Sequence, residues 1–77
     1  MKYKVGSVVQ ITAAGTKKAA PSDENLWEIV GIQGNDCAIR NMYDEYRANT
    51  RNQHCSAQPW HTSMVIPWKG KLPIQFR

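Results

Sequence analysis

Short runs in which every second residue is apolar alternate with turn residues along the chain, a pattern typical of β-strands. The clearest case is Leu26–Met42, where two such runs surround Gly34-Asn35. A glycine-asparagine pair between two apolar runs indicates a tight β-hairpin. We therefore predict that this hairpin is the ribbon around which the rest of the chain closes.

The first strand of this hairpin has a break in its alternation. Trp27 and Ile29 share one parity, whereas Ile32, after Gly31, has the other. Because glycine inside a strand often marks a bulge or a sharp bend, a bulge at Val30-Gly31 would turn all three side chains inward. The inner face of the hairpin is then predicted to comprise Trp27, Ile29, Ile32, Cys37 and Ile39.

The segments around this hairpin predict a further strand on each side and two loops. Tyr3–Thr12 has apolar residues of one parity and predicts the first strand. Residues 13–25 are rich in turn-forming residues and predict a long loop. The polar stretch 43–59 predicts the tip of a long hairpin whose return strand lies near Gln53–Gln58. One helical turn at Tyr43–Arg47 is the alternative.

Pro67 divides the end of the chain into two parts. Before it, His61–Met64 suits a short 3₁₀ turn and Val65-Ile66 a closing strand. Pro67 is expected to end the pairing, because proline has no amide hydrogen to donate. After it, Lys69–Arg77 is a basic tail that is either frayed or packed as an extra strand on the body or on a neighbouring chain.

Five short strands without a convincing helix predict an all-β fold. The predicted architecture is one small SH3-like barrel of about five antiparallel strands with one short 3₁₀ turn. This domain would comprise residues 1–68, followed by the tail of residues 69–77. An OB-like barrel is the alternative, but that fold usually needs more residues and a helix.

The length and composition agree with one small soluble domain. The chain has 77 residues, of which 42% are apolar, enough for a compact core. Its apolar runs are too short to span a bilayer, and its start lacks the apolar segment of a signal peptide. We therefore expect a cytoplasmic protein without a membrane partner.

Two parts of the sequence resemble known groups of SH3-like proteins. The opening KYKVGSVVQI is similar to the first strand of small bacterial and phage barrels that begin K-x-G-D-x-V-x-L, with Ser7 in place of the aspartate. The later PWHTSMVIPW resembles their turn and closing strand. The resemblance implies an SH3-like fold. Separately, short proteins of this style are frequent cargo of phages and integron cassettes, which suggests a mobile genetic element as the source.

The segment WEIVGI, Trp27 to Ile32, is similar to the core of type II dihydrofolate reductases, which are tetramers of such barrels. That family places a V-Q-I-Y tetrapeptide in its active pore. Here His61 to Val65, HTSMV, stands at the corresponding place, so the catalytic residues do not carry over. The resemblance therefore implies the fold and a homo-oligomer, without the activity.

The charges of the chain are separated along the sequence. The net charge is +4, but all six acidic residues lie between Asp23 and Glu45, where Arg40 is the one basic residue. Lysines and arginines dominate both flanks. We expect a surface with one acidic and one basic patch, which suits self-association or a protein partner as well as nucleic acid.

Few residues indicate catalysis or metal binding. His54, Cys55 and His61, with Cys37 as a fourth ligand, lack the spacing that is typical of structural zinc sites. A Cys55 nucleophile would need an oxyanion hole and an orienting group, and neither is evident in the sequence. We expect no cofactor, no metal and no catalytic residue. Whether Cys37 and Cys55 form a disulfide stays open, because sequence spacing does not place the sulfurs within reach.

Aromatic and basic residues provide the candidate binding site. Exposed rings beside arginines act as stacking platforms for single-stranded nucleic acid and as hot spots in protein interfaces. The candidate binding residues are Arg40, Tyr43, Tyr46, Arg47, Arg51, Trp60, His61 and Trp68.

Three hypotheses of function follow from this site. The first is a non-enzymatic, self-associating module that contacts proteins through its exposed aromatics and the loop 43–59, because Asp44 and Glu45 would repel phosphate. The second is nucleic-acid binding through Arg40, Arg47, Arg51 and the tail lysines. The third, small-molecule binding or catalysis at an oligomer pore, rests on the resemblance to the reductases.

Overall fold

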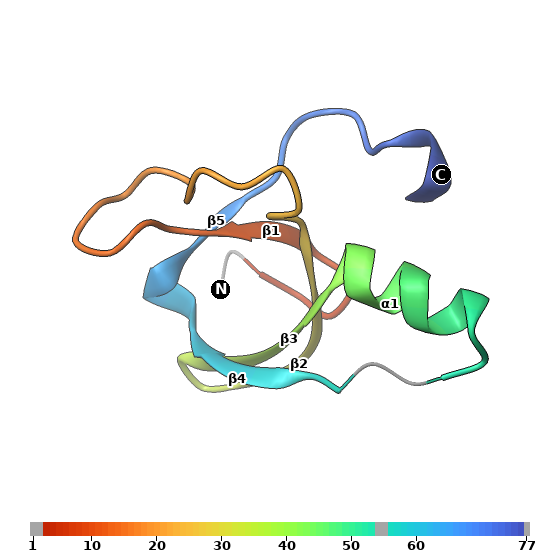
Figure 1. Cartoon of the computed structure of the whole chain (residues 1–77). Coiled ribbons are helices and arrows are strands. Elements are labelled where there is room, and N and C mark those ends of the chain that lie inside the picture. The colour runs from red at the N-terminus through yellow and green to blue at the C-terminus, as the bar shows by residue number, and fades with distance from the viewer. Residues whose placement is uncertain (1–2, 54–55, 77) are drawn as a thin grey trace.

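A computed structural model describes residues 3–53 and 56–76 of the chain. In these residues, five antiparallel strands form one open sheet in the order β4-β3-β2-β1-β5, accompanied by one α-helix (Figure 1). The five antiparallel strands of the all-β prediction are therefore confirmed, whereas the helix was not expected. The elements are β1 (Val8–Ile11), β2 (Trp27–Gln33), β3 (Asp36–Asn41), α1 (Met42–Thr50), β4 (Gln58–His61), the 3₁₀ helix η1 (Thr62–Met64), β5 (Val65–Pro67) and the 3₁₀ helix η2 (Ile74–Phe76).

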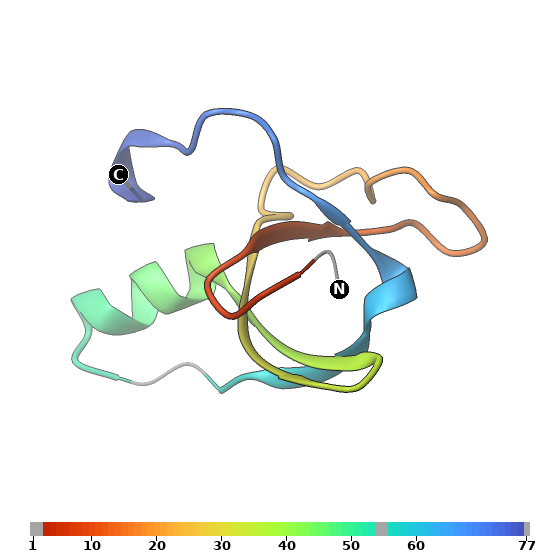
Figure 2. The same cartoon turned by 180° about the vertical axis from the view of Figure 1, so that it is seen from behind.

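The hairpin β2–β3 forms as the sequence predicts. Ile29 pairs with Ile39, but the next pair is Gly31 with Ala38, so one residue of β2 is left over in a bulge. This bulge lies where the break in alternation predicted it, at Val30-Gly31. The bend helps to curve the sheet, and the N-terminal segment lies within the curve (Figure 2).

The core lies on the inner side of this curved sheet. Its buried residues come from all strands except β4 and are Val9, Ile29, Cys37, Ile39 and Val65. Partly buried residues that pack against them are Tyr3, Ile11, Trp27, Ile32 and Trp60. The predicted inner face of the hairpin is therefore confirmed.

The first strand is shorter than the sequence pattern predicts. The backbone turns before β1, where Ser7 N donates to Lys4 O at 3.0 Å and Gly6 adopts a φ of 97°. A glycine accepts this left-handed conformation without the strain that a side chain would add. Because of this turn, the strand expected from Tyr3 begins only at Val8.

The segment 43–59 contains a helix, so the prediction of a long hairpin tip is wrong. Asn41 ends β3 and caps α1, because its side-chain oxygen accepts from Asp44 N at 3.0 Å. At the other end, Asn52 adopts a φ of 55°, and Gln53 N donates to Ala48 O at 2.8 Å. This closure is typical of a helix C-terminus. The return strand accordingly starts at Gln58 and not near Gln53.

The 3₁₀ turn and the closing strand are found as predicted, but Pro67 does not end the pairing, because its backbone nitrogen faces away from β1. The 3₁₀ turn η1 leads directly from β4 into β5, which ends at Pro67. One further backbone bond follows, because Trp68 N donates to Val8 O at 2.9 Å. No helix in the part of the chain that the structure describes has the length and apolarity for a membrane span.

Asn25 is a buried polar residue, 3% exposed, that joins β1 to the loop 13–25 and to β2. Its Oδ1 accepts from Ile11 N at 3.0 Å and from Trp27 Nε1 at 3.1 Å. Its Nδ2 donates to Ile11 O at 2.9 Å and to Ala20 O at 3.1 Å. All four hydrogen-bonding positions of the amide are therefore used, which makes the burial of this polar group tolerable.

Each of the two edge strands carries a proline whose backbone nitrogen faces the open edge of the sheet. Backbone groups of an antiparallel strand point alternately toward and away from the neighbouring strand. Thr62 N donates to Asn35 O at 2.9 Å, so by alternation Pro59 faces the open edge of β4. The bond from Trp68 N to Val8 O places Pro67 in the same way on β5. Neither proline offers an N–H there, which blocks the addition of a strand.

We predict that the variant Pro59→Val/Pro67→Val associates edge to edge. Each substitution restores one outward N–H in a residue type that favours strands. Light scattering during gel filtration should then show species larger than those of the unchanged protein, increasing with concentration. Pro73→Val, outside the sheet, is the control and should leave the size unchanged. An unchanged size of the double variant would show that the prolines do not protect the edges.

We predict that Asn25→Asp lowers the free energy of unfolding by about 3 kcal/mol, because the Ala20 carbonyl loses its side-chain donor, the Ile11 carbonyl loses one of its two donors, and a charge is buried. The midpoint of urea denaturation measures this change. Asn35→Asp, at an exposed turn, is the matched control and should cost far less. Equal midpoints for the two variants would refute the role assigned to Asn25.

Candidate interaction surface on helix α1

The helix α1 brings together several of the predicted binding residues. It begins directly after β3, and Asp44 and Glu45 lie in its first turn, where negative charge is favourable to the helix dipole. Asn41 not only caps the helix but also donates from Nδ2 to Glu24 O at 2.8 Å. Asn41 thereby fixes the helix to β3 and to the end of the loop 13–25.

Two tyrosines of α1 form an aromatic cluster with a residue of the tail. The rings of Tyr43 and Phe76 meet edge to face, with 5.0 Å between their centroids and 82° between their planes. Tyr46 and Phe76 are 6.1 Å apart at 90°. Edge-to-face geometry is one of the two arrangements that aromatic pairs prefer, the other being offset stacking. We call the pair Tyr43 and Tyr46 the tyrosine notch and residues 69–76 the strap.

The aromatic cluster is accompanied by apolar surface that is open to solvent. Tyr46 is 48% exposed, and Ile74, two residues before Phe76, is 81% exposed. Figures 1 and 2 show the strap leaving β5 and passing over α1. The tail expected to be frayed or packed as an extra strand therefore packs through its 3₁₀ helix η2 on the helix of its own chain.

Arg47 is surrounded by carboxylates. Its Nη1 donates to Glu24 Oε1 at 2.7 Å and its Nη2 to Glu24 Oε2 at 3.2 Å, a two-pronged contact. Nη2 also contacts Asp44 Oδ1. The hydrogen bonds from Arg47 lower the pKa of Glu24, and the two carboxylates raise the pKa of Arg47. All three side chains are about half exposed, so the pairs contribute little to stability.

Arg40 is paired in the same way with the next acidic residue of the helix. Its Nη1 lies 2.9 Å from Glu45 Oε1, and both side chains are about 30% exposed. Its Nε is buried and has no hydrogen-bond partner among the described residues. Two of the three arginines proposed to bind ligands are thus neutralised within the molecule.

The remaining predicted residues do not join this cluster. Trp60 is turned inward and packs against the core. His61 caps η1, because its Nδ1 accepts from Ser63 N at 3.1 Å. Trp68 is partly buried under Gly70, where an added Cβ would lie 2.7 Å from the indole Cζ2. Arg51 is exposed at the C-terminal cap of α1.

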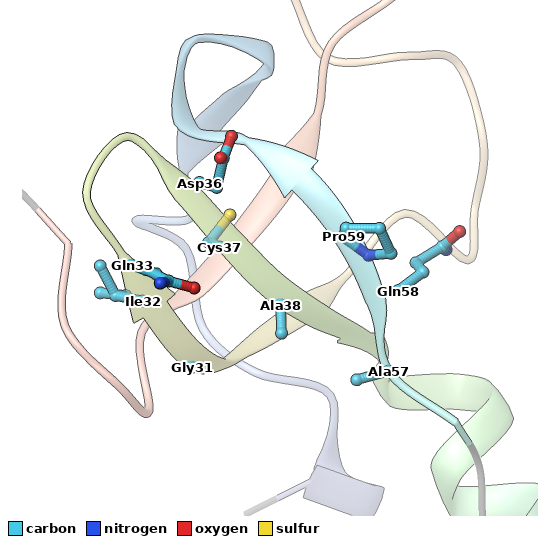
Figure 3. A pocket seen from close by; sticks show the side chains of 9 residues that line it. All are labelled: Gly31, Ile32, Gln33, Asp36, Cys37, Ala38, Ala57, Gln58 and Pro59. Atoms are coloured by element: carbon cyan, nitrogen blue, oxygen red, sulfur yellow. The ribbon is translucent and has the colours of Figure 1, made fainter.

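A separate pocket of about 440 Å³, which the sequence did not reveal, lies on the strands β2, β3 and β4 (Figure 3). Small residues on adjacent strands, Gly31, Ala38 and Pro59, leave space there. Among its lining residues, Asp36 carries the one charge. The complete lining is Gly31, Ile32, Gln33, Asp36, Cys37, Ala38, Ala57, Gln58 and Pro59.

The thiol of Cys37 is the one sulfur group among the residues that line this pocket. Cys37 is buried, and its Sγ donates to Trp60 O at 3.2 Å. Burial, with a smaller effect from the charge of Asp36, raises the pKa of the Cys37 thiol, so it is protonated at neutral pH and a poor nucleophile. The described residues contain no cluster of three potential metal ligands. His54 and Cys55, with the metal and disulfide hypotheses that depend on them, lie outside the described residues.

Comparison with known proteins gives no relative. No protein-family model matches the chain, and no curated protein and no solved structure shows significant similarity to it.

We predict that Asn41→Ala lowers the free energy of unfolding by about 1–2 kcal/mol, because it removes the helix cap and the bond to Glu24 O. Asn41→Ser is the matched comparison, because its hydroxyl oxygen can accept from Asp44 N, the amide donor to Glu24 O is lost, and no charge is added. Urea denaturation should place the stability of the matched variant between that of the unchanged chain and that of Asn41→Ala. The helical signal in circular dichroism should follow the same order. An alanine variant with unchanged helical signal and stability would contradict the role of Asn41.

Proposed function

We propose that this chain is a small non-enzymatic binding module, built on an SH3-like barrel, that contacts other proteins through α1 and the strap. Five short antiparallel strands, a bulge that bends β2, and a single 3₁₀ turn between β4 and β5 support the barrel. A phage or another mobile element is the source that we propose, because short proteins of this style are frequent cargo of such elements.

The observation that carries this proposal is the pairing of the arginines next to the exposed rings. Phosphate binding requires free guanidinium groups, but Arg47 already contacts Glu24 and Asp44, and Arg40 contacts Glu45. Beside these ion pairs, the surface exposes the aromatic ring of Tyr46 and the aliphatic side chain of Ile74. Aromatic side chains with a polar rim are the usual centre of a protein interface.

Nucleic-acid binding would need a different set of residues. Among the described residues, Arg51, Lys69 and Lys71 form no ion pair and could still contact phosphate. Two of these residues belong to the strap and one to the end of α1. The nearby carboxylates of Glu24, Asp44 and Glu45 would therefore repel a phosphate bound there. We therefore favour a protein partner.

We predict that peptides selected from a random library on the immobilised chain bind through the tyrosine notch. Tyr46→Ala should weaken their binding at least about tenfold, since loss of an aromatic hot spot typically costs more than 1 kcal/mol. Lys17→Ala, in the exposed part of the loop 13–25, is the control and should leave the affinity unchanged. Fluorescence polarisation of labelled peptides measures both.

The same assay tests the nucleic-acid function. Single- and double-stranded DNA and RNA are titrated at two salt concentrations, and no salt-sensitive binding is expected at micromolar protein. Salt-sensitive binding that Arg51→Gln weakens would overturn the proposal in favour of nucleic acid. Selected peptides that bind Tyr46→Ala as tightly as the unchanged chain would place the interface elsewhere.

A further inference from the structure

The strap contacts α1 as a ligand contacts a binding site, with the ring of Phe76 bound between two side chains of the helix. Tyr43 and Tyr46 are three residues apart, so their side chains lie on one face of the helix. Phe76 presents one ring to both of them, at 5.0 Å and 6.1 Å between centroids. The tyrosine notch thus accepts a single aromatic ring from a short 3₁₀ helix, which here belongs to the same chain.

The charges of the two parts are complementary. Around the notch, Asp44 and Glu45 belong to the first turn of α1, and Glu24 is joined to the same helix through Arg47. With Arg40 and Arg47, these residues leave an excess of one negative charge. The strap carries two positive charges, those of Lys69 and Lys71, and no acidic residue. A basic segment with an aromatic residue is therefore the ligand that suits this surface.

Residues 68–70, which we call the pivot, connect the strap to the end of β5. The backbone bond from Trp68 N to Val8 O secures the end of β5. Two residues later, Gly70 lies so close to the indole of Trp68 that an added Cβ would be 2.7 Å from Cζ2 and 3.0 Å from Cη2. A side chain at residue 70 would therefore require either the indole of Trp68 or the strap to move.

We propose that two copies of the chain exchange their straps, each placing Phe76 in the tyrosine notch of the other. This inference rests on the proposed function and names a second copy as the partner. The exchanged contact is the one that the structure shows within a single chain, so the dimer needs no new interface. Because the strap is tethered to its own notch at a high effective concentration, exchange is weak until the pivot is disturbed.

The first test alters the pivot and the ring separately in the full chain. Gly70→Ala disfavours the closed course of the strap and should lower the protein concentration for half-dimerisation at least tenfold in sedimentation equilibrium. Phe76→Ala should abolish dimerisation. Ile74→Ala is the control, because this exposed residue of the same strap lies outside the aromatic contact, and it should behave as the unchanged chain.

The second test combines two defective chains. Phe76→Ala has an empty notch, and Tyr43→Ala/Tyr46→Ala has a strap without a notch, so neither can close on itself. When the first is labelled with ¹⁵N and titrated with the second to millimolar concentration, amide shifts should change along α1. The same titration with a second chain that also carries Phe76→Ala should change none of them.

The outcomes separate this inference from the proposed function. Absence of shifts along α1 in the first mixture, or dimerisation of Phe76→Ala equal to that of the unchanged chain, would overturn strap exchange. If library peptides still bound through Tyr46 in that case, the binding module would stand without self-exchange. Shifts in the first mixture together with no selected peptide would support strap exchange and overturn the module for foreign partners.

Discussion

The side chain of Asn41 is the constraint on which the candidate surface depends. Its oxygen accepts from Asp44 N and so starts α1, while its amide nitrogen donates to Glu24 O. One buried residue, 8% exposed, thereby ends a strand, starts a helix and fixes both to a loop that precedes the hairpin. Because no linker separates β3 from α1, the direction of the helix, and with it the position of the tyrosine notch, follows from the sheet.

The electrostatics of this surface depend on the same connection. Glu24 and Arg47 are 23 residues apart in sequence, yet they form a two-pronged contact because Asn41 holds the loop beside the helix. The contact removes Arg47 from the charges that a phosphate could use. A group of arginines that suggests nucleic acid in the sequence becomes, in the folded chain, the polar rim of an aromatic surface.

The sheet itself restricts where a partner can bind. Pro59 and Pro67 occupy outward positions on its two edge strands, so neither edge offers a continuous row of donors. The inner side is filled by the core, and the pocket on β2, β3 and β4 presents small side chains and a protected thiol. The helix and the strap together expose an aromatic and an aliphatic side chain, those of Tyr46 and Ile74.

The sequence by itself determined the elements whose signals are local. The hairpin at Gly34-Asn35, the bulge at Val30-Gly31 and the turn η1 with its closing strand all follow from side-chain parity and turn residues, and the structure has them. Parity also identified Ile29, Cys37 and Ile39 as core residues. The helix was predictable in part, because Asn41 with Asp44 three residues later is a capping signal, and Asn52 marks a helix end.

Only the tertiary structure decided that residues 42–50 form a helix and not the tip of a hairpin. α1 has no buried residue, so no apolar periodicity distinguishes it, and its cap is completed by Glu24 from another part of the chain. The partners of Arg47, the four hydrogen bonds of Asn25 and the contact of Phe76 with the tyrosine notch are likewise non-local. Sequence patterns report periodicity within a segment, whereas these contacts join segments whose approach depends on the completed sheet.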